Sequence, residues 1–204
     1  LSITDNGIGM TYDELIDSLG TIAKSGSLEF MQKLKNKTDK EAIDIIGQFG
    51  VGFYSAFMVA SKVEVRTKSP FSEDGYLFTS SGTETYAIDK VADLPVGTTV
   101  TLYLRKNGKE ENYDEFLEEY NIRRLVKKYS DYIRYPIRMK VKKSVPKLDD
   151  EGKPVSGKYD EVEEIETLNS MTPIWKRRKA DVTEEELNDF YRQKYFDAND
   201  PIVT

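Results

Sequence analysis

At residues 5–10 the chain reads Asp5-Asn6-Gly7-Ile8-Gly9-Met10, directly after an alternating segment that starts with Leu1 and Ile3. Alternation of apolar and polar residues is typical of a β-strand, and Asp-Asn-Gly is a strong turn signal. A structural turn is the simpler interpretation of this stretch alone. A carboxylate at the end of a buried strand, however, needs a hydrogen-bond donor, and Gly9 would let a flat ring approach the backbone.

A second glycine-rich stretch, Gly47-Gln48-Phe49-Gly50-Val51-Gly52, runs directly into the apolar residues 53–60. Phe53 and Phe57 lie four residues apart, which predicts a buried helix that begins at the glycines. Backbone amides at such a helix start can bind phosphate groups, although helix–strand packing explains the glycines equally well. The spacing matches neither the P-loop nor the dinucleotide pattern G-x-G-x-x-G.

A third element, Gly97-Thr98, stands at the head of a predicted strand at residues 99–104. A lone Gly-Thr pair is structural in most proteins, and the Thr98 hydroxyl becomes useful only if the fold brings it beside Asp5. Together the three elements indicate a site for a purine nucleotide, in which the exocyclic amine of adenine would be the donor to the carboxylate.

The composition excludes several kinds of chemistry. The 204 residues include neither Cys nor His, so disulfides, zinc–thiolate sites and Ser-His-Asp hydrolysis are excluded. The net charge of -6 argues against nucleic acid as the main partner. No apolar run approaches the length of a membrane span and no signal peptide is visible, so we expect a cytoplasmic protein with no membrane partner.

The pattern of elements predicts an α+β fold, a two-layer α/β sandwich with a mainly antiparallel, mixed sheet. Capping boxes at Thr11/Glu14 and Thr183/Glu186 predict helices at residues 12–19 and 184–196. A longer helical pattern covers residues 116–133. Short strands are expected as an antiparallel meander near residues 62–66, 76–78, 86–88 and 99–104, followed by a last strand at 137–141.

A change in composition divides the chain. Residues 144–166 are rich in Pro, Gly and charged side chains, which predicts a charged linker. We therefore expect one domain at residues 1–143, the linker at 144–166, and the beginning of a second domain at 167–204, which is too short for a core of its own. Neither end of the sequence carries a start or stop signal, so the chain is expected to be a piece of a longer one.

The three elements resemble the ATP-binding fold shared by gyrase-type topoisomerases, heat-shock chaperones, sensor histidine kinases and mismatch-repair ATPases. Longer strings are more specific, and they resemble the heat-shock protein 90 family. These strings are residues 5–11, Leu19-Gly20-Thr21-Ile22-Ala23-Lys24-Ser25-Gly26, residues 46–56, and Asn169-Ser170-Met171-Thr172-Pro173-Ile174-Trp175. The last string resembles the opening of that family's middle domain, and the short linker resembles the bacterial form of the family.

The resemblance implies a role for each matching residue. Asp5 would accept the adenine amine, assisted through water by the Thr98 hydroxyl, while Gly9 and Met10 would line the base pocket. Ser18 would lie near the ribose, where many eukaryotic members carry Asn. The residues implied at the phosphates are Lys24 and the amides of Gly50, Val51, Gly52 and Phe53. Residues 20–27 would form a mobile lid.

The resemblance also implies that parts of the active site lie outside this sequence. In the family, the catalytic glutamate and the asparagine that holds Mg²⁺ precede the Asp-Asn-Gly turn, and an arginine comes from the middle domain. We therefore assign no catalytic residue and no metal ligand here, and we expect weak nucleotide binding without turnover from this chain alone.

The leading hypothesis is an ATP-dependent chaperone of the heat-shock and stress response. By resemblance, its ligands are ATP or ADP with Mg²⁺, its partners are unfolded or partly folded client proteins, and it dimerises through a C-terminal region absent here. The alternatives are a mismatch-repair or gyrase-like ATPase that acts on DNA, and an interaction module without enzyme activity. A sensor kinase is the weakest alternative, because the sequence has no phospho-accepting His.

Overall fold

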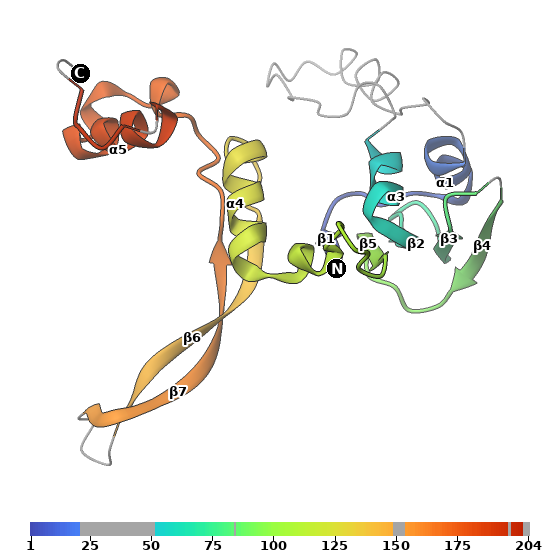
Figure 1. The fold of residues 1–204 in the computed structure, drawn as a ribbon. Coiled ribbons are helices and arrows are strands. Elements are labelled where there is room, and N and C mark those ends of the chain that lie inside the picture. Colours follow the sequence, from blue (N-terminus) through green and yellow to red (C-terminus); the bar gives the residue numbers. More distant parts are fainter. Residues whose placement is uncertain (21–51, 84, 149–153, 196, 202–204) are drawn as a thin grey trace. The chain divides into compact units, whose positions relative to one another are not determined.

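The computed structural model describes residues 1–20, 52–83, 85–148, 154–195 and 197–201 (Figure 1). The chain divides into two compact units, Leu1–Leu117 and Glu118–Thr204. The proposed site residues Lys24, Gly50 and Val51 lie outside the described residues, as do residues 21–27 of the predicted lid.

The first unit is built on a five-stranded sheet in the order β1-β5-β2-β3-β4, and each of these pairings is antiparallel. The strands are β1 (Ser2–Asp5), β2 (Ala60–Lys68), β3 (Gly75–Ser80), β4 (Tyr86–Val91) and β5 (Gly97–Leu104). Strands β2, β3 and β4 form the predicted meander. Strand β5 departs from it, because it crosses back and inserts between β1 and β2. This insertion places the start of β5 beside the end of β1.

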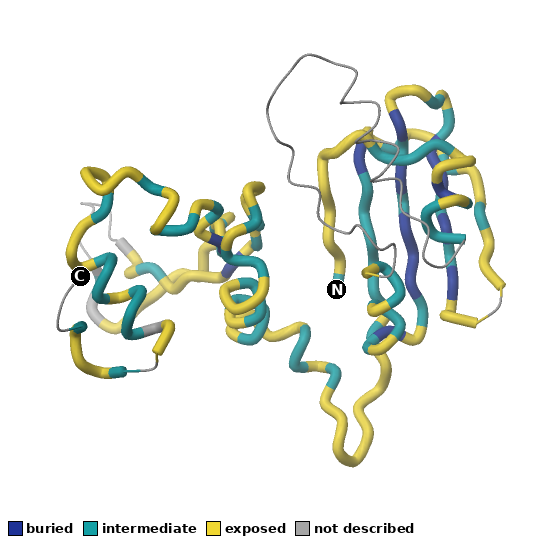
Figure 2. The backbone as a smooth tube through the Cα atoms, turned by 90° about the horizontal axis from the view of Figure 1, so that it is seen from above, coloured by how far each residue is buried: buried dark blue, intermediate teal, exposed yellow. Residues whose placement is uncertain are grey.

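One face of the sheet carries the core. Val63 and Val65 of β2 alternate with charged residues, and both are almost completely buried against Phe78 of β3. Leu15 of α1 (Tyr12–Leu19) is fully buried in the same cluster. Buried residues accordingly concentrate on the central strands (Figure 2). The first unit is therefore a layer of short helices on an antiparallel sheet, which confirms the α+β prediction.

The predicted capping box of α1 is present. The Thr11 hydroxyl accepts from the Glu14 backbone N–H at 3.4 Å, and the Glu14 carboxylate accepts from the Thr11 N–H at 2.9 Å. The two contacts satisfy backbone donors that an uncapped helix start leaves without partners. The sequence therefore locates the start of this helix correctly.

The apolar residues 53–60 differ from the buried helix that their spacing predicts. They form a 3-10 turn, η1 (Phe53–Ser55), then one helical turn, α3 (Ala56–Val59), and Ala60 already begins β2. Phe53 and Phe57 pack against the core, whereas Met58 is 74% exposed. The apolar residues 53–60 therefore belong to two different elements, a helical turn and the start of β2. A short apolar run does not distinguish a helix from a buried strand, so the pattern does not show where one element ends and the next begins.

A further 3-10 turn, η2 (Tyr113–Leu117), ends the first unit, and α4 (Glu119–Tyr129) opens the second. Helix α4 ends at Tyr129, four residues before the predicted end at residue 133. The next residue, Ser130, donates its backbone N–H to the Val126 carbonyl at 2.8 Å. The second unit continues with strands β6 (Arg138–Leu148) and β7 (Pro154–Thr167), the 3-10 turns η3 (Ile174–Lys176) and η4 (Lys179–Asp181), and helix α5 (Glu184–Tyr195).

Residues 144–166, expected to be a charged linker, lie largely in the ribbon formed by β6 and β7. The lysines of β6 meet the acidic residues of β7: Lys143 and Glu164 approach to 2.8 Å, and Lys142 and Glu161 to 3.6 Å. The composition does not reveal this ribbon, because opposite charges segregated on two strands have the same composition as a solvated linker. Among the described residues, no helix is long and apolar enough to cross a membrane.

Candidate functional site

A row of side chains crosses the first unit from strand to strand. Asp5 of β1 lies opposite Thr98 of β5, Thr98 lies opposite Thr67 of β2, and Thr67 lies opposite Tyr76 of β3. Residues directly opposite in antiparallel strands point to the same face of a sheet. The structure thus brings together Asp5 and Thr98, which are far apart in the sequence.

The turn after β1 folds back over the ends of β2 and β5. Gly9 has φ +60°, and a Cβ added there would stand 2.0 Å from the Lys68 carbonyl oxygen and 3.0 Å from that of Gly97. The next residue, Met10, donates its backbone N–H to the Thr67 hydroxyl at 2.9 Å. Only glycine allows this approach, so Gly9 holds the turn directly against the row.

Gly97 closes the same corner from the other side. Its φ is +129°, and a Cβ there would lie 2.4 Å from the Asp5 carbonyl oxygen. The two predicted motifs therefore touch through their glycines as well as through the Asp5–Thr98 pair. The described part of the site is a tightly packed backbone corner with a carboxylate and two hydroxyl groups in line.

The Asp5 carboxylate is less enclosed than the sequence suggests. All four residues of β1 are exposed, because β1 is an edge strand of the described sheet, so the expectation of a buried strand is wrong here. One carboxylate oxygen of Asp5 accepts from the Gly7 N–H at 2.8 Å. Among the described residues no second partner bonds this carboxylate, so it retains acceptor capacity for a ligand donor.

The remaining predicted residues are not joined to the row by described contacts. Ser18 is half-buried on α1, and within the described residues no hydrogen bond connects it to Asp5, Thr67 or Thr98. Gly52 is exposed, and no described residue comes within 4 Å of a Cβ added there. The Phe53 ring packs edge-on against Phe57 and Phe78, so this side chain belongs to the core. Among the described residues, no group of three or more acidic side chains could hold a metal ion.

Thr67 is the site residue that the sequence motifs miss. It is 1% exposed, and its hydroxyl contacts both the turn after β1 and the start of β5. A signal for it exists in the sequence. Positions 63, 65 and 67 face the same side of β2, and the first two are Val. The alternation therefore predicts an apolar residue at position 67, and the sequence has a threonine there instead.

The opposite face of the sheet carries a charged cluster. Glu64 of β2 is 8% exposed, and Lys62 donates to it at 2.9 Å. The hydrogen bond from Lys62 is the main cause that lowers the pKa of Glu64. Arg66 approaches the other carboxylate oxygen to 3.1 Å without a well-aligned hydrogen bond. Since these residues point away from the row, this cluster is separate from the candidate site.

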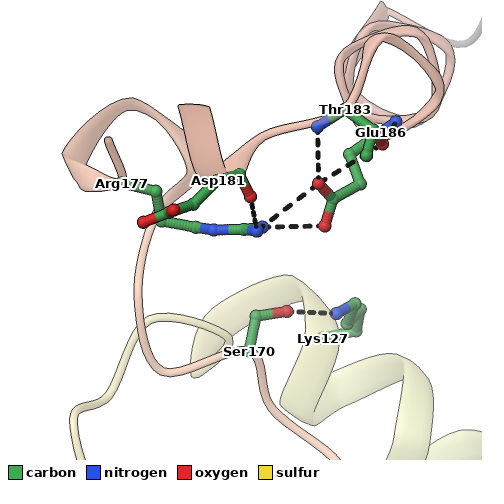
Figure 3. Close-up of polar contacts among 6 residues, drawn as sticks. All are labelled: Lys127, Ser170, Arg177, Asp181, Thr183 and Glu186. Atoms are coloured by element: carbon green, nitrogen blue, oxygen red, sulfur yellow. Dashed lines mark hydrogen bonds and ion pairs between the residues drawn. The ribbon is translucent and has the colours of Figure 1, made fainter. Parts of the chain in front are cut away.

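In the second unit, the Asn169–Trp175 motif is held by polar contacts with the segment after α4. Asn169, 6% exposed, accepts from the Ile137 N–H at 2.8 Å and donates to the carbonyls of Ile133 at 2.8 Å and Tyr135 at 3.0 Å. Lys127 donates to the Ser170 hydroxyl at 2.8 Å (Figure 3). These contacts fasten the motif to α4 and the residues that follow it.

The second predicted capping box also forms. The Thr183 hydroxyl accepts from the Glu186 N–H at 3.2 Å, and the Glu186 carboxylate accepts from the Thr183 N–H at 2.9 Å. Arg177 donates to the same carboxylate at 2.8 Å and also to the carbonyl of Asp181 (Figure 3). The hydrogen bond from Arg177 is the main cause that lowers the pKa of Glu186. This cluster stabilises the start of α5.

Two family profiles match the chain. Residues 1–83 match the family described as histidine kinase-, DNA gyrase B-, and HSP90-like ATPase, and residues 147–204 match the Hsp90 protein family. The chain is 50% identical over 204 residues to chaperone protein HtpG of Clostridium acetobutylicum. It is 48% identical over 203 residues to that of Bacillus velezensis, and 50% identical over 202 residues to that of Halalkalibacterium halodurans. These alignments cover 99% or more of the chain and 31% of each relative.

Proposed function

The chain belongs to the heat-shock protein 90 family, and from this membership we propose that its first unit carries the adenine end of a nucleotide site in an ATP-dependent molecular chaperone. The observation that carries the proposal is the row in which Asp5 and Thr98 stand opposite each other, beside the turn held by Gly9. Since the chain spans about 31% of its relatives' length, the activity proposed is that of the whole protein.

In this proposal the Asp5 carboxylate accepts the exocyclic amine of adenine. The Thr98 hydroxyl supports the same amine through a water molecule, and Gly9 and Met10 form the wall against which the flat base lies. Gly9 holds this wall against the end of β2, because an added Cβ would stand 2.0 Å from the Lys68 carbonyl oxygen. Ser18 is proposed near the ribose.

The phosphate side of the site is proposed from the resemblance alone. Lys24 and the amides of Gly50, Val51, Gly52 and Phe53 would bind the phosphate groups, because backbone N–H groups free of side chains make an anion site. Mg²⁺ would accompany the nucleotide and neutralise its charge. The whole protein would hydrolyse ATP with groups supplied by other parts of its chain.

The proposed partners are unfolded or partly folded client proteins and a second copy of the whole protein, in the cytoplasm. The division into an ATP-binding domain at 1–143, a linker at 144–166 and the start of a middle domain at 167–204 also remains a proposal. The compact units of the structure divide at Leu117/Glu118, and the ribbon of β6 and β7 lies within the second of them.

Calorimetric titration of ADP and Mg²⁺ tests the nucleotide site, with the full-length protein beside the 204-residue chain. We expect Asp5→Asn to weaken binding by about 10- to 100-fold, since a hydrogen bond to a charged group contributes about 1.5–3 kcal/mol. Asp89→Asn is the matched control, because it removes the same charge from β4, at the other edge of the sheet. Failure of the unmodified full-length protein to bind ADP would refute the proposed function.

A further inference from the structure

The Thr67 hydroxyl contacts both the turn after β1 and the start of β5. Its hydroxyl oxygen lies 2.9 Å from the Met10 backbone nitrogen, 3.2 Å from the Gly97 carbonyl oxygen and 3.0 Å from the Thr98 hydroxyl oxygen. The residue is 1% exposed, so no solvent competes for these contacts. A single buried hydroxyl therefore has three polar neighbours within hydrogen-bond distance.

The directions of these hydrogen bonds follow from the number of protons available. A threonine hydroxyl donates one hydrogen bond and accepts two. The Met10 N–H can only donate, so it occupies one acceptor position of Thr67. The Gly97 carbonyl can only accept, so it takes the Thr67 proton. The one position left on Thr67 is an acceptor, and the Thr98 hydroxyl must therefore donate its proton to Thr67.

This arrangement determines what Thr98 presents to a ligand. With its only proton directed at Thr67, the Thr98 hydroxyl has acceptor positions alone for any other partner. Its neighbour on the other side in the row is Asp5, and an ionised carboxylate also only accepts. The two groups that face a ligand at this corner are therefore both acceptors, and they favour a ligand edge that carries N–H donors.

We propose that Thr67 is a positioning residue that makes the site selective for a 6-amino purine over a 6-oxo purine, by holding the Thr98 hydroxyl as an acceptor. The inference rests on the proposed nucleotide site. Adenine carries an amine at position 6, whereas guanine and hypoxanthine carry a carbonyl oxygen there. A water that bridges Asp5 and Thr98 gives one proton to each of these acceptors, so it too meets the ligand only as an acceptor. A carbonyl oxygen at this corner therefore meets no donor, and an unpaired polar group weakens binding.

The inference predicts a specific effect of removing the Thr67 hydroxyl. Thr67→Val keeps the shape of the side chain but releases the Thr98 proton, which can then turn toward a ligand carbonyl. We expect the ratio of the inosine diphosphate Kd to the ADP Kd to fall by about tenfold, the size of one uncharged hydrogen bond. Thr67→Ser keeps the hydroxyl and should preserve the ratio even where the loss of a methyl group lowers stability.

Both Kd values are measured by calorimetry on the full-length protein, for the unmodified form and the two variants, with Mg²⁺ throughout. A purely structural role for Thr67 would weaken binding of both nucleotides by one factor and leave the ratio unchanged, which would overturn the inference. If the unmodified protein binds ADP poorly, the proposed function fails instead, so the two failures are distinguishable.

Thr67→Val also leaves the Met10 N–H and the Gly97 carbonyl without their partner, so thermal unfolding is recorded beside each titration. Should this variant not fold, Thr67→Cys replaces it, since a thiol has similar size and is a weak donor and acceptor. The Thr67→Cys ratio should then fall below that of Thr67→Ser. Equal ratios for the Cys and Ser variants would contradict the inference.

Discussion

Gly9 and Gly97 show how single residues shape the corner of the sheet. Each has a positive φ, and at each an added Cβ would come within 2.4 Å or less of a carbonyl oxygen of a neighbouring segment. A side chain would face both a strained backbone conformation and a backbone atom that cannot rotate away. The two glycines therefore allow Asp5 and Thr98 to meet.

Gly9→Ala is expected to lower the free energy of unfolding by about 2–5 kcal/mol, the left-handed penalty plus the cost of displacing packed backbone. Urea unfolding of the chain without nucleotide measures the loss. Gly52→Ala is the matched control, because Gly52 has φ -60° and, in the part of the chain that the structure describes, nothing lies within 4 Å of an added Cβ. Equal losses for the two variants would contradict this expectation, because the approach of the added Cβ at position 9 to the Lys68 carbonyl would then have no measurable effect on stability.

At the scale of elements, the ribbon of β6 and β7 shows charge acting between strands. The shortest of its ion pairs, Lys143–Glu164 at 2.8 Å, joins side chains that are about half exposed. Exposed pairs contribute little individually, and salt screens them. The ribbon nevertheless aligns a basic strand with an acidic one, so the charges favour this pairing over the pairing of either strand with a copy of itself.

Lys143→Glu is expected to destabilise the ribbon by about 0.5–1 kcal/mol, because it places a negative charge beside Glu164. The double variant Lys143→Glu/Glu164→Lys restores opposite charges and should recover most of the loss. Hydrogen exchange of the backbone amides of β6 and β7 at low salt measures both effects. At about 1 M salt, where the screening length is about 3 Å, the difference between single and double variants should nearly vanish.

An equal loss in the single and double variants would contradict the role of charge and assign the effect to strand propensity. The pair Lys147–Asp160, separated by 3.9 Å, offers an internal comparison. The same exchange of charges there should produce a smaller change in hydrogen exchange, because Coulomb attraction falls with distance.

At the scale of the whole molecule, four carboxylates lose a proton more easily in the folded chain than their ordinary pKa values predict. The pKa values of Glu64, Glu166 and Glu186 are lowered, in each case chiefly by a hydrogen bond from a basic side chain. The pKa of Asp197 is also lowered, chiefly by the Asn199 backbone N–H. These carboxylates lie in both units, so acid sensitivity is a property of the entire chain.

The stability of the chain is therefore expected to fall on acidification. The unfolded chain takes up protons near the ordinary glutamate value of 4.5, and the folded chain takes them up only at lower pH. The stabilising contribution is thus fully present above about pH 5 and is lost as the pH falls through the lowered folded values. Denaturant unfolding from pH 7 to pH 3 measures this loss.

Glu64→Gln should flatten that pH profile, because the variant has no proton to bind at this position. Glu110→Gln is the control, since Glu110 is exposed and forms no ion pair among the described residues. A profile for Glu64→Gln that runs parallel to that of the unmodified chain would show that this ion pair does not contribute to acid sensitivity.

The sequence alone predicted the parts of the fold that depend on local chemistry. The two capping boxes place the starts of α1 and α5 correctly, because a cap is completed by side chains three residues apart. The strands around Val63, Val65, Phe78 and Val100 follow from alternation for the same local reason. Asp5, Gly9 and Thr98 were selected from short motifs, and they do lie together in the structure.

Only the tertiary structure decided what depends on distant segments. The crossing of β5 between β1 and β2 creates the Asp5–Thr98–Thr67 row, and no pattern within a strand reveals which strand it pairs with. The same limit hid the ribbon of β6 and β7, which covers much of the stretch where composition alone predicted a linker. The role of Thr67 depends on the acceptor and donor that other segments bring to it, because the direction of a hydrogen bond is set by all of its partners.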